Sequence, residues 1–177
     1  MKNQSWKAVV AIATATLLAG CERHVSPPAA VANEIALSFL SSREGKFCAS
    51  AYTDCTLREL SRTLIAREVD LNDDGQPEYL IESTSAHLCG NRSCVRWVYR
   101  KTATGYEAIG DDFGEPQKQT SFGYRDMLEE TNVFPGLDGR YLYRFEGHRY
   151  ELAGCWERDT ARKRWEPCDG WNKTSAE

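Results

Sequence analysis

The cysteines constrain this chain more than any other residue type. The sequence holds seven of them, and all except Cys21 fall into close pairs along the chain. Short spacing within each pair predicts three local disulfides, although other connectivities are open to six cysteines. A zinc site is the alternative, but there is no Cys-x-x-Cys pair and the three histidines are scattered. The predicted pairs are Cys48 with Cys55, Cys89 with Cys94, and Cys155 with Cys168.

The N-terminus carries a short apolar segment behind two lysines. Lys2 and Lys7 precede an apolar run over residues 8–18, whose last residue begins the segment Leu18-Ala19-Gly20-Cys21. A run of about a dozen residues is too short for a membrane-spanning helix, which takes about 20. Small residues before the expected cleavage position are typical of a signal peptide. The arrangement resembles the lipobox of bacterial lipoproteins.

This resemblance implies that residues 1–20 are removed and that Cys21 becomes lipidated. The thiol would receive a diacylglycerol group and the new N-terminus an acyl chain such as palmitate, and about 0.8 kcal/mol per buried methylene would hold the protein at a membrane. Glu22 is not the Asp that favours retention at the inner membrane, so the resemblance implies an outer-membrane protein facing the periplasm. The alternative is an ordinary secretory signal with an unmodified Cys21. Lipidation and ordinary secretion would both place the domain in an oxidising environment, which favours disulfides.

Composition predicts one acidic domain. The chain has 22 basic and 26 acidic side chains, and loss of Lys2 and Lys7 would change the formal charge from −4 to −6. A net negative charge of this kind gives no indication of the basic surface that binds nucleic acid. Residues 21–33 are small, polar and Pro-containing and are expected to form a lipidated flexible tether. Residues 34–177 are long enough for a single globular domain.

The expected fold class is α+β: an N-terminal helix followed by a mostly antiparallel β-meander. Asn33 is a suitable N-cap for a helix with Ile35, Leu37, Phe39 and Leu40 that ends near Gly45. From residue 64 onward, short β-type runs alternate with turn residues. The expected strands are 65–71, 78–83, 95–101, 106–109, 124–129, 140–145 and 149–152.

Part of this β region repeats. Residues 97–110 align without gaps on residues 141–154, with Tyr, Arg, Tyr, Glu and Gly recurring at matching positions. Each copy reads as a hairpin preceded by a further strand, residues 80–84 in the first unit and 127–131 in the second. The connecting loops would be 89–94 and 132–139. Such units favour blade-like stacked sheets or one continuous meander.

The segment Asp70-Leu71-Asn72-Asp73-Asp74-Gly75-Gln76-Pro77-Glu78 is the strongest motif. Ca²⁺ needs six to eight oxygens, and alternate residues of a tight loop can direct their oxygens to one centre. An EF-hand is not expected, because Ile81 stands where the bidentate acid belongs. The loop is similar to the strand-flanked calcium loops of FG-GAP and integrin-type blades. The alternative is a hairpin turn without metal. The candidate ligands are Asp70, Asn72, Asp74, the Gln76 carbonyl and Glu78.

The C-terminal cysteine pair encloses a second candidate surface. A turn at residues 160–161 would place Trp156 opposite Trp165, Glu157 opposite Arg164 and Asp159 opposite Arg162. Aromatic and Arg side chains on a cross-linked hairpin are typical of protein-binding hot spots. The alternative is that the tryptophans only cover the edge of the core. The candidate binding residues are Trp156, Arg158, Arg164, Trp165 and Trp171.

Catalytic motifs are lacking in the sequence, which has no Gly-x-Ser-x-Gly elbow, His-Glu-x-x-His pair or phosphate-binding Gly loop. We therefore expect no enzyme and no cofactor other than Ca²⁺. The expected function is a non-enzymatic binding or scaffold lipoprotein whose partner is a periplasmic protein or a cell-wall component. The alternative is a lipid-anchored inhibitor or immunity protein against a wall- or membrane-attacking enzyme.

Overall fold

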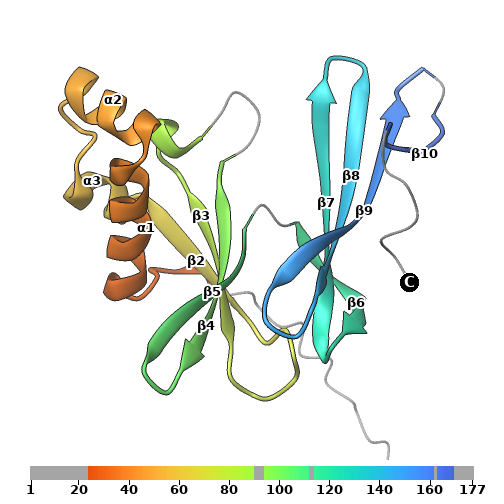
Figure 1. The fold of residues 1–177 in the computed structure, drawn as a ribbon, viewed down its shortest axis with the longest axis horizontal. Coiled ribbons are helices and arrows are strands. Elements are labelled where there is room, and N and C mark those ends of the chain that lie inside the picture. The colour runs from red at the N-terminus through yellow and green to blue at the C-terminus, as the bar shows by residue number, and fades with distance from the viewer. Residues whose placement is uncertain (1–23, 90–93, 112–113, 162, 170–177) are drawn as a thin grey trace, which may run out of the picture.

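The computed structural model describes residues 24–89, 94–111, 114–161 and 163–169. Within them the chain forms two five-stranded antiparallel sheets and three α-helices at the N-terminal end (Figure 1). The mostly antiparallel β structure after a helical start agrees with the α+β prediction. The agreement is partial, because the helices are short and make up little of the chain. The predicted signal peptide and Cys21 lie outside the described residues, as does Trp171.

The first sheet has its strands in sequence order, and three helices lie between its first and second strands. Its strands are β1 (His24–Val25), β2 (Leu64–Val69), β3 (Glu78–Ser83), β4 (Arg96–Thr102) and β5 (Gly105–Asp111). The helices are α1 (Ala29–Ser41), α2 (Arg43–Ala51) and α3 (Leu57–Arg62), and a 3₁₀ turn η1 spans Ala86–Leu88.

The second sheet has the order β10-β9-β8-β7-β6 and is also antiparallel. Its strands are β6 (Glu115–Ser121), β7 (Tyr124–Phe134), β8 (Leu137–Phe145), β9 (Tyr150–Asp159) and β10 (Glu166–Pro167). Strand β6 was not predicted, because it is polar and contains Pro116; Pro is tolerated at a sheet edge, where β6 lies. The predicted loop 132–139 is wrong, since β7 and β8 continue pairing as far as Phe134 and Leu137.

The helices differ from the single one predicted. The first begins at Ala29, directly after Pro28 and not at an Asn33 cap, because three of residues 29–32 are alanine, the strongest helix former. It breaks at Ser42, whose side chain accepts a hydrogen bond from the Gly45 amide at 3.0 Å and caps α2. Gly45 therefore lies inside α2 and does not end a helix. A Cβ at Gly45 would stand 2.0 Å from the Phe39 carbonyl oxygen, so glycine permits the close approach.

The tether prediction is also wrong for residues 24–33. His24–Val25 pairs with β2, and α1 packs into the core through Val31 and Ala32. Apolar side chains at 31 and 32, together with an extended pair at 24–25, incorporate this stretch into the domain. Residues 21–23 lie outside the described part of the chain.

Two apolar clusters build a three-layer arrangement, with the helices against one face of the first sheet and the second sheet against the other (Figure 1). In the first cluster α1 and α3 pack on Ala66, Ile81 and Tyr99. Successive strand residues point to opposite faces, so Leu80 and Val98 project from the same strands into the second cluster. The second sheet contributes Tyr124, Met127, Phe145 and Tyr150.

Strand register strongly supports the internal repeat. The β4–β5 ladder has an irregularity between Val98 and Tyr99, and the β8–β9 ladder has one at the aligned positions Leu142 and Tyr143. Beyond it, Arg100 pairs with Glu107 just as Arg144 pairs with Glu151. Both hairpins thus share one register, bulge included.

The alignment predicted for the preceding strand is wrong by one residue. The ladders pair Leu80 with Val98 and Leu128 with Leu142, so Leu80 corresponds to Leu128 and not to Met127. The corrected register also matches the cross-strand ion pair Arg96–Glu82 with Arg140–Glu130. A one-residue slip exchanges the two faces of a strand, so this correction decides which side chains are equivalent.

The corrected register shows that the two sheets stack face to back. Tyr79 and Tyr99 of the first sheet face the helices, whereas their equivalents Met127 and Tyr143 face the first sheet. Leu80 and Val98 lie under the second sheet, and their equivalents are Leu128 and Leu142. The outer face of the second sheet is therefore equivalent to a covered face of the first.

All three predicted disulfides are present. Cys48–Cys55 joins the end of α2 to the start of α3 within the first core, and Cys89–Cys94 closes the loop before β4. Cys155–Cys168 ties the C-terminal segment to β9. The local pairing predicted from spacing is confirmed.

Candidate functional site

The predicted calcium loop connects β2 to β3, as expected for a strand-flanked loop. Its acidic side chains bind the loop's own amides: Asp70 accepts from the amides of Asp74 and Gly75, at 3.2 and 2.9 Å, and Asp74 accepts from that of Gln76 at 2.7 Å. Positive φ at Asp73 and Gly75 closes the turn. These contacts describe a compact Asx-type loop, the conformation that both the metal and the metal-free prediction require.

Glu78 lies at the base of this loop and is almost fully buried. Its carboxylate accepts a hydrogen bond from the Leu71 amide at 2.9 Å. Burial raises the pKa of Glu78, and the negative charges of Asp74 and Asp70 raise it further against the Leu71 hydrogen bond. Three carboxylates thus repel one another, which a cation would relieve. Within the described residues, no cluster of three or more His, Cys, Asp or Glu is arranged to hold a metal ion.

The loop is also attached to the second sheet. Arg125 donates from its side chain to Asp73 at 2.8 Å and from its amide to the Leu71 carbonyl at 2.8 Å. Asp73 was not a predicted ligand, and its carboxylate points to Arg125 instead of into the loop. The loop therefore has an evident structural role as a bridge between the sheets.

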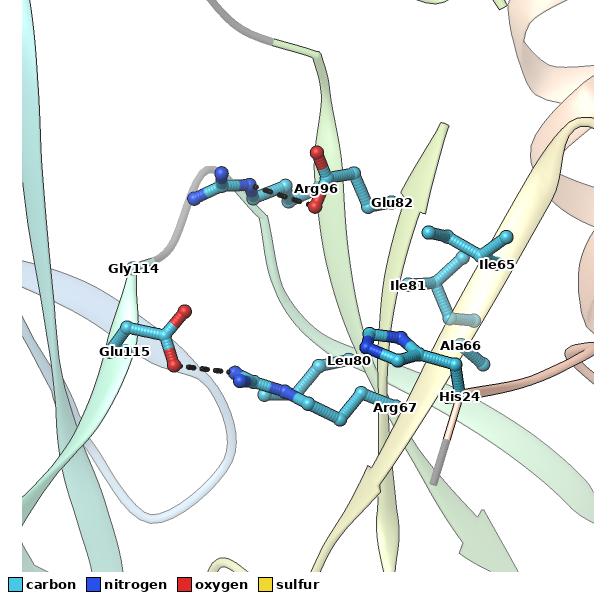
Figure 2. A pocket seen from close by; sticks show the side chains of 10 residues that line it. All are labelled: His24, Ile65, Ala66, Arg67, Leu80, Ile81, Glu82, Arg96, Gly114 and Glu115. Carbon is cyan, nitrogen blue, oxygen red and sulfur yellow. Dashed lines mark hydrogen bonds and ion pairs between the residues drawn. The ribbon is translucent and has the colours of Figure 1, made fainter. Parts of the chain in front are cut away.

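A small pocket of about 180 Å³ lies between the first sheet and the start of β6 (Figure 2). In Figure 2 Arg67 reaches from β2 to Glu115 of β6, at 2.8 Å, and Arg96 faces Glu82 at 3.7 Å. The described lining has no Ser, Thr, Cys or Tyr that could act as a nucleophile. Its charged groups are paired with one another, so this pocket is best explained as a polar brace between the sheets.

A larger groove of about 530 Å³ lies on the outer face of the second sheet, and we call it the outer groove. Its side chains come from four neighbouring strands and from the segment before β10. Alternation along β6, β7 and β8 places these residues on one face. The lining residues are Gln117, Gln119, Asp126, Leu128, Arg140, Leu142, Arg144, Trp156 and Trp165.

Two tryptophans and two arginines form one end of the outer groove. The guanidinium of Arg140 lies 4.3 Å from the ring centroid of Trp165, and that of Arg158 lies 4.8 Å from it. Trp156 lies flat against the sheet, since a Cβ on Gly154 would stand 2.4 Å from its ring. These stacked planar groups hold rigid aromatic surface at the groove.

Each arginine at the groove faces a carboxylate. Arg140 pairs with Glu130, and Arg158 donates to Asp138 at 2.6 Å, which lowers the pKa of Asp138. Arg144 Nε lies 3.6 Å from Asp126 Oδ2, beyond hydrogen-bond distance. The groove is thus polar but close to charge-balanced.

Asp126 is the most unusual group in the groove, because its side chain is only 6% exposed. Among the described residues, its Oδ1 atom and the buried Nε of Arg144 have no hydrogen-bond partner. A buried polar atom without a partner costs about 1–3 kcal/mol. This acceptor and donor lie side by side on the groove wall.

The structure brings together only some of the residues of the predicted binding surface. Trp156 and Trp165 do line one groove and Arg158 adjoins it, whereas Arg164 is exposed and is not part of the lining. Trp156 faces Pro167 and Glu157 faces Glu166, so the predicted register is wrong by two residues. The Lys163 amide binds the Asp159 carbonyl, which makes the turn longer than the two residues assumed.

Sequence reasoning missed Asp126, Arg140, Arg144 and the two glutamines. Asp126, Leu128, Arg140, Leu142 and Arg144 do alternate along β7 and β8, which is the available signal. That signal becomes readable only when the corrected register fixes which face is covered. Gln117 and Gln119 could not be assigned to this face from the sequence, because β6 was not predicted as a strand.

Comparison of the chain with protein-family models, with curated proteins and with solved structures gave no match. In the part of the chain that the structure describes, helices are too short or too polar to cross a membrane.

Proposed function

We propose that this protein is a non-enzymatic binding module, anchored through a lipidated Cys21 to the periplasmic side of the outer membrane. The observation that carries the binding role is the outer groove, which is lined both by two tryptophans and by two residues that hold buried polar atoms without hydrogen-bond partners. Rigid aromatic side chains with a few convergent polar groups are typical of binding sites. The stacked hairpin units act as blade-like supports for this face.

Photo-cross-linking in intact cells tests the groove as the binding surface. A photoreactive phenylalanine at exposed Gln119, on the groove, should give a discrete adduct. The same residue at exposed Lys101, in the β4–β5 hairpin, is the matched control. No adduct from position 119, or the same adduct from both positions, would contradict the proposed surface.

The anchor has its own test. Replacement Cys21→Ala removes the thiol that accepts the lipid, so the variant should leave the detergent phase in which the unchanged protein is recovered. Phase partitioning followed by immunoblotting measures this. Equal partitioning of both proteins would refute lipidation at Cys21.

We also propose that the 70–78 loop binds Ca²⁺ as a structural ion, through Asp70, Asn72, Asp74, the Gln76 carbonyl and Glu78. Support comes from the mutual repulsion of its carboxylates. Saturation at about a hundredfold excess over Kd would stabilise the fold by about 2.7 kcal/mol.

A calcium titration of the thermal melt tests this. The unchanged protein should gain Tm with Ca²⁺ and lose it with chelator, and Asp74→Ala should abolish the response. Asp73→Ala is the matched control, since Asp73 points to Arg125, and it should keep the response. If the Tm changes with neither Ca²⁺ nor chelator, the proposed calcium site is refuted.

An inhibitor or immunity protein is the second candidate, and one observation favours it. Phe47 of α2 is 69% exposed and Tyr52, which follows α2, is 53% exposed, beside the Cys48–Cys55 disulfide. Apolar side chains on a braced element suit insertion into a partner's cleft. A photoreactive phenylalanine at exposed Tyr52 should then give a discrete adduct with a protein, which Phe47→Ser should abolish and Lys101→Ser should leave unchanged.

A further inference from the structure

We infer that the outer groove binds a neutral saccharide chain, with Asp126 and Arg144 holding its hydroxyl groups. The inference rests on the proposed function, namely that this groove is a binding site, and specifies the ligand. The argument has three steps, which concern charge, hydrogen-bonding capacity and surface.

Charge balance excludes strongly charged ligands. Arg140 and Arg158 are each satisfied by a carboxylate, Glu130 and Asp138, and Arg144 lies beside Asp126. A phosphate or other polyanion needs surplus cationic groups, and a basic peptide needs surplus carboxylates. Neither surplus exists among the groups that face the groove, so the matching ligand carries little net charge.

The two buried atoms without hydrogen-bond partners define which hydrogen-bonding groups such a ligand must carry. Asp126 Oδ1 is a buried acceptor, and the adjacent Arg144 Nε is a buried donor. A hydroxyl group both donates and accepts, so vicinal hydroxyls satisfy both atoms at once. The exposed amide of Gln119 and the amide of Gln117 add further donors and acceptors on the same wall.

Comparison within the molecule shows how the environment of Asp126 differs from that of its repeat equivalent. Its repeat equivalent is Glu78, which is also buried but accepts the Leu71 amide of the long loop. The second repeat replaces that loop by a short turn at Phe122-Gly123. Asp126 is therefore a buried acid that has no counterpart of the Leu71 amide, which donates a hydrogen bond to Glu78.

The surface supplies the remaining contact. A pyranose ring has apolar C–H faces, which pack on flat aromatic rings. Trp156 lies flat over Gly154 beside Leu142, and the stacked Trp165 continues this surface. Aromatic faces next to paired planar polar groups suit a chain of sugar rings better than an extended peptide, which would present unpaired amides along its whole length.

Isothermal titration of the full chain in a detergent without a sugar headgroup tests the inference. The probes are a β-1,4-linked N-acetylglucosamine tetrasaccharide, maltotetraose and a blocked tetraalanine peptide. At least one saccharide should bind and the peptide should not. Asp126→Asn keeps the side-chain size but replaces an acceptor oxygen by a donor, and it should weaken binding at least about tenfold.

Controls separate the possible failures. Glu107→Gln removes a carboxylate opposite an arginine in the first hairpin and should leave saccharide affinity unchanged. If Asp126→Asn fails to fold, Gln119→Leu takes its place, with the same expected direction. Binding of the peptide alone, no saccharide binding, or binding insensitive to these groove variants overturns the inference. A position-119 adduct with a protein in that case leaves the proposed binding function standing.

Discussion

Glu78 and Asp126 occupy equivalent positions in the two repeats, and both carboxylates are buried. The first belongs to the loop that bridges the sheets, whereas the second faces the outer groove. A sequence alone does not reveal this pair, because Glu-Tyr-Leu and Asp-Met-Leu match only after the one-residue correction. Asp and Glu side chains are almost never fully buried in proteins. Two buried acids in one domain are therefore the most unusual feature of this molecule at the scale of single residues.

Burial of Glu78 makes stability depend on pH. The pKa of Glu78 is raised above 4.5 in the folded state, so the folded protein binds this proton at higher pH than the unfolded chain. Its contribution to stability is therefore full below about pH 4.5 and is lost as the pH rises through the folded pKa.

Replacement Glu78→Gln removes the titration but keeps an acceptor for the Leu71 amide. In chelator, the unfolding free energy of the unchanged protein relative to Glu78→Gln should increase as the pH falls from neutral towards about 4.5. Urea melts at several pH values measure this difference, and exposed Glu107→Gln serves as the control. A difference that stays constant with pH would show that Glu78 does not titrate in this window.

At the scale of elements, sequence patterns predicted hairpins and disulfides well and predicted ends poorly. The β3 bounds, the hairpin repeat and the three cysteine pairs follow from alternation and spacing. Strands β7 and β9 run well beyond the predicted 124–129 and 149–152, because the polar ends of both strands pair with β8, as in Asn132 with Asp138 and Arg158 with Asp138. Tertiary pairing of this kind overrides local propensity.

The repeated glycines give a matched prediction. Gly110 and Gly154 are equivalent, but a Cβ on Gly110 would lie 3.2 Å from Tyr150 of the second sheet, and one on Gly154 would meet the Trp156 ring. Gly110→Ala should destabilise the fold by about 1–3 kcal/mol, because the buried Tyr150 side chain must shift to make room for the methyl group. Gly154→Ala should cost less and instead change Trp fluorescence as the indole moves. Chemical denaturation with emission spectra checks both, and equal costs would contradict the proposed difference.

At the scale of the whole molecule, the two sheets share one core. Phe145 of the second sheet is 2% exposed and lies in one buried cluster with Val98 and Ile109 of the first. Arg67–Glu115 and Arg125–Asp73 add polar links between the sheets. Sequence reasoning could not foresee this layer, because periodicity shows that a strand is apolar on a face but not which element covers that face.

A shared core predicts cooperative unfolding. Phe145→Ala should destabilise the protein by about 3–5 kcal/mol, since it removes a large side chain from between the sheets. Phe122→Ala, at a residue 72% exposed, should change stability by less than about 0.5 kcal/mol. Circular dichroism and tryptophan emission should report one coincident transition in each variant. Two separated transitions would show that the sheets unfold independently.

Face-to-back stacking has no built-in end, as in a filament that grows by adding identical subunits in one direction. In this molecule growth is stopped at both ends, by the helices over the first sheet and by Trp156 over Gly154 on the last. Where Tyr150 of the next layer covers Gly110, the terminal layer covers its own glycine with an indole from the same strand. At the second sheet, the indole that ends the series also lines the outer groove, so the surface that stops the stacking is the one proposed for binding.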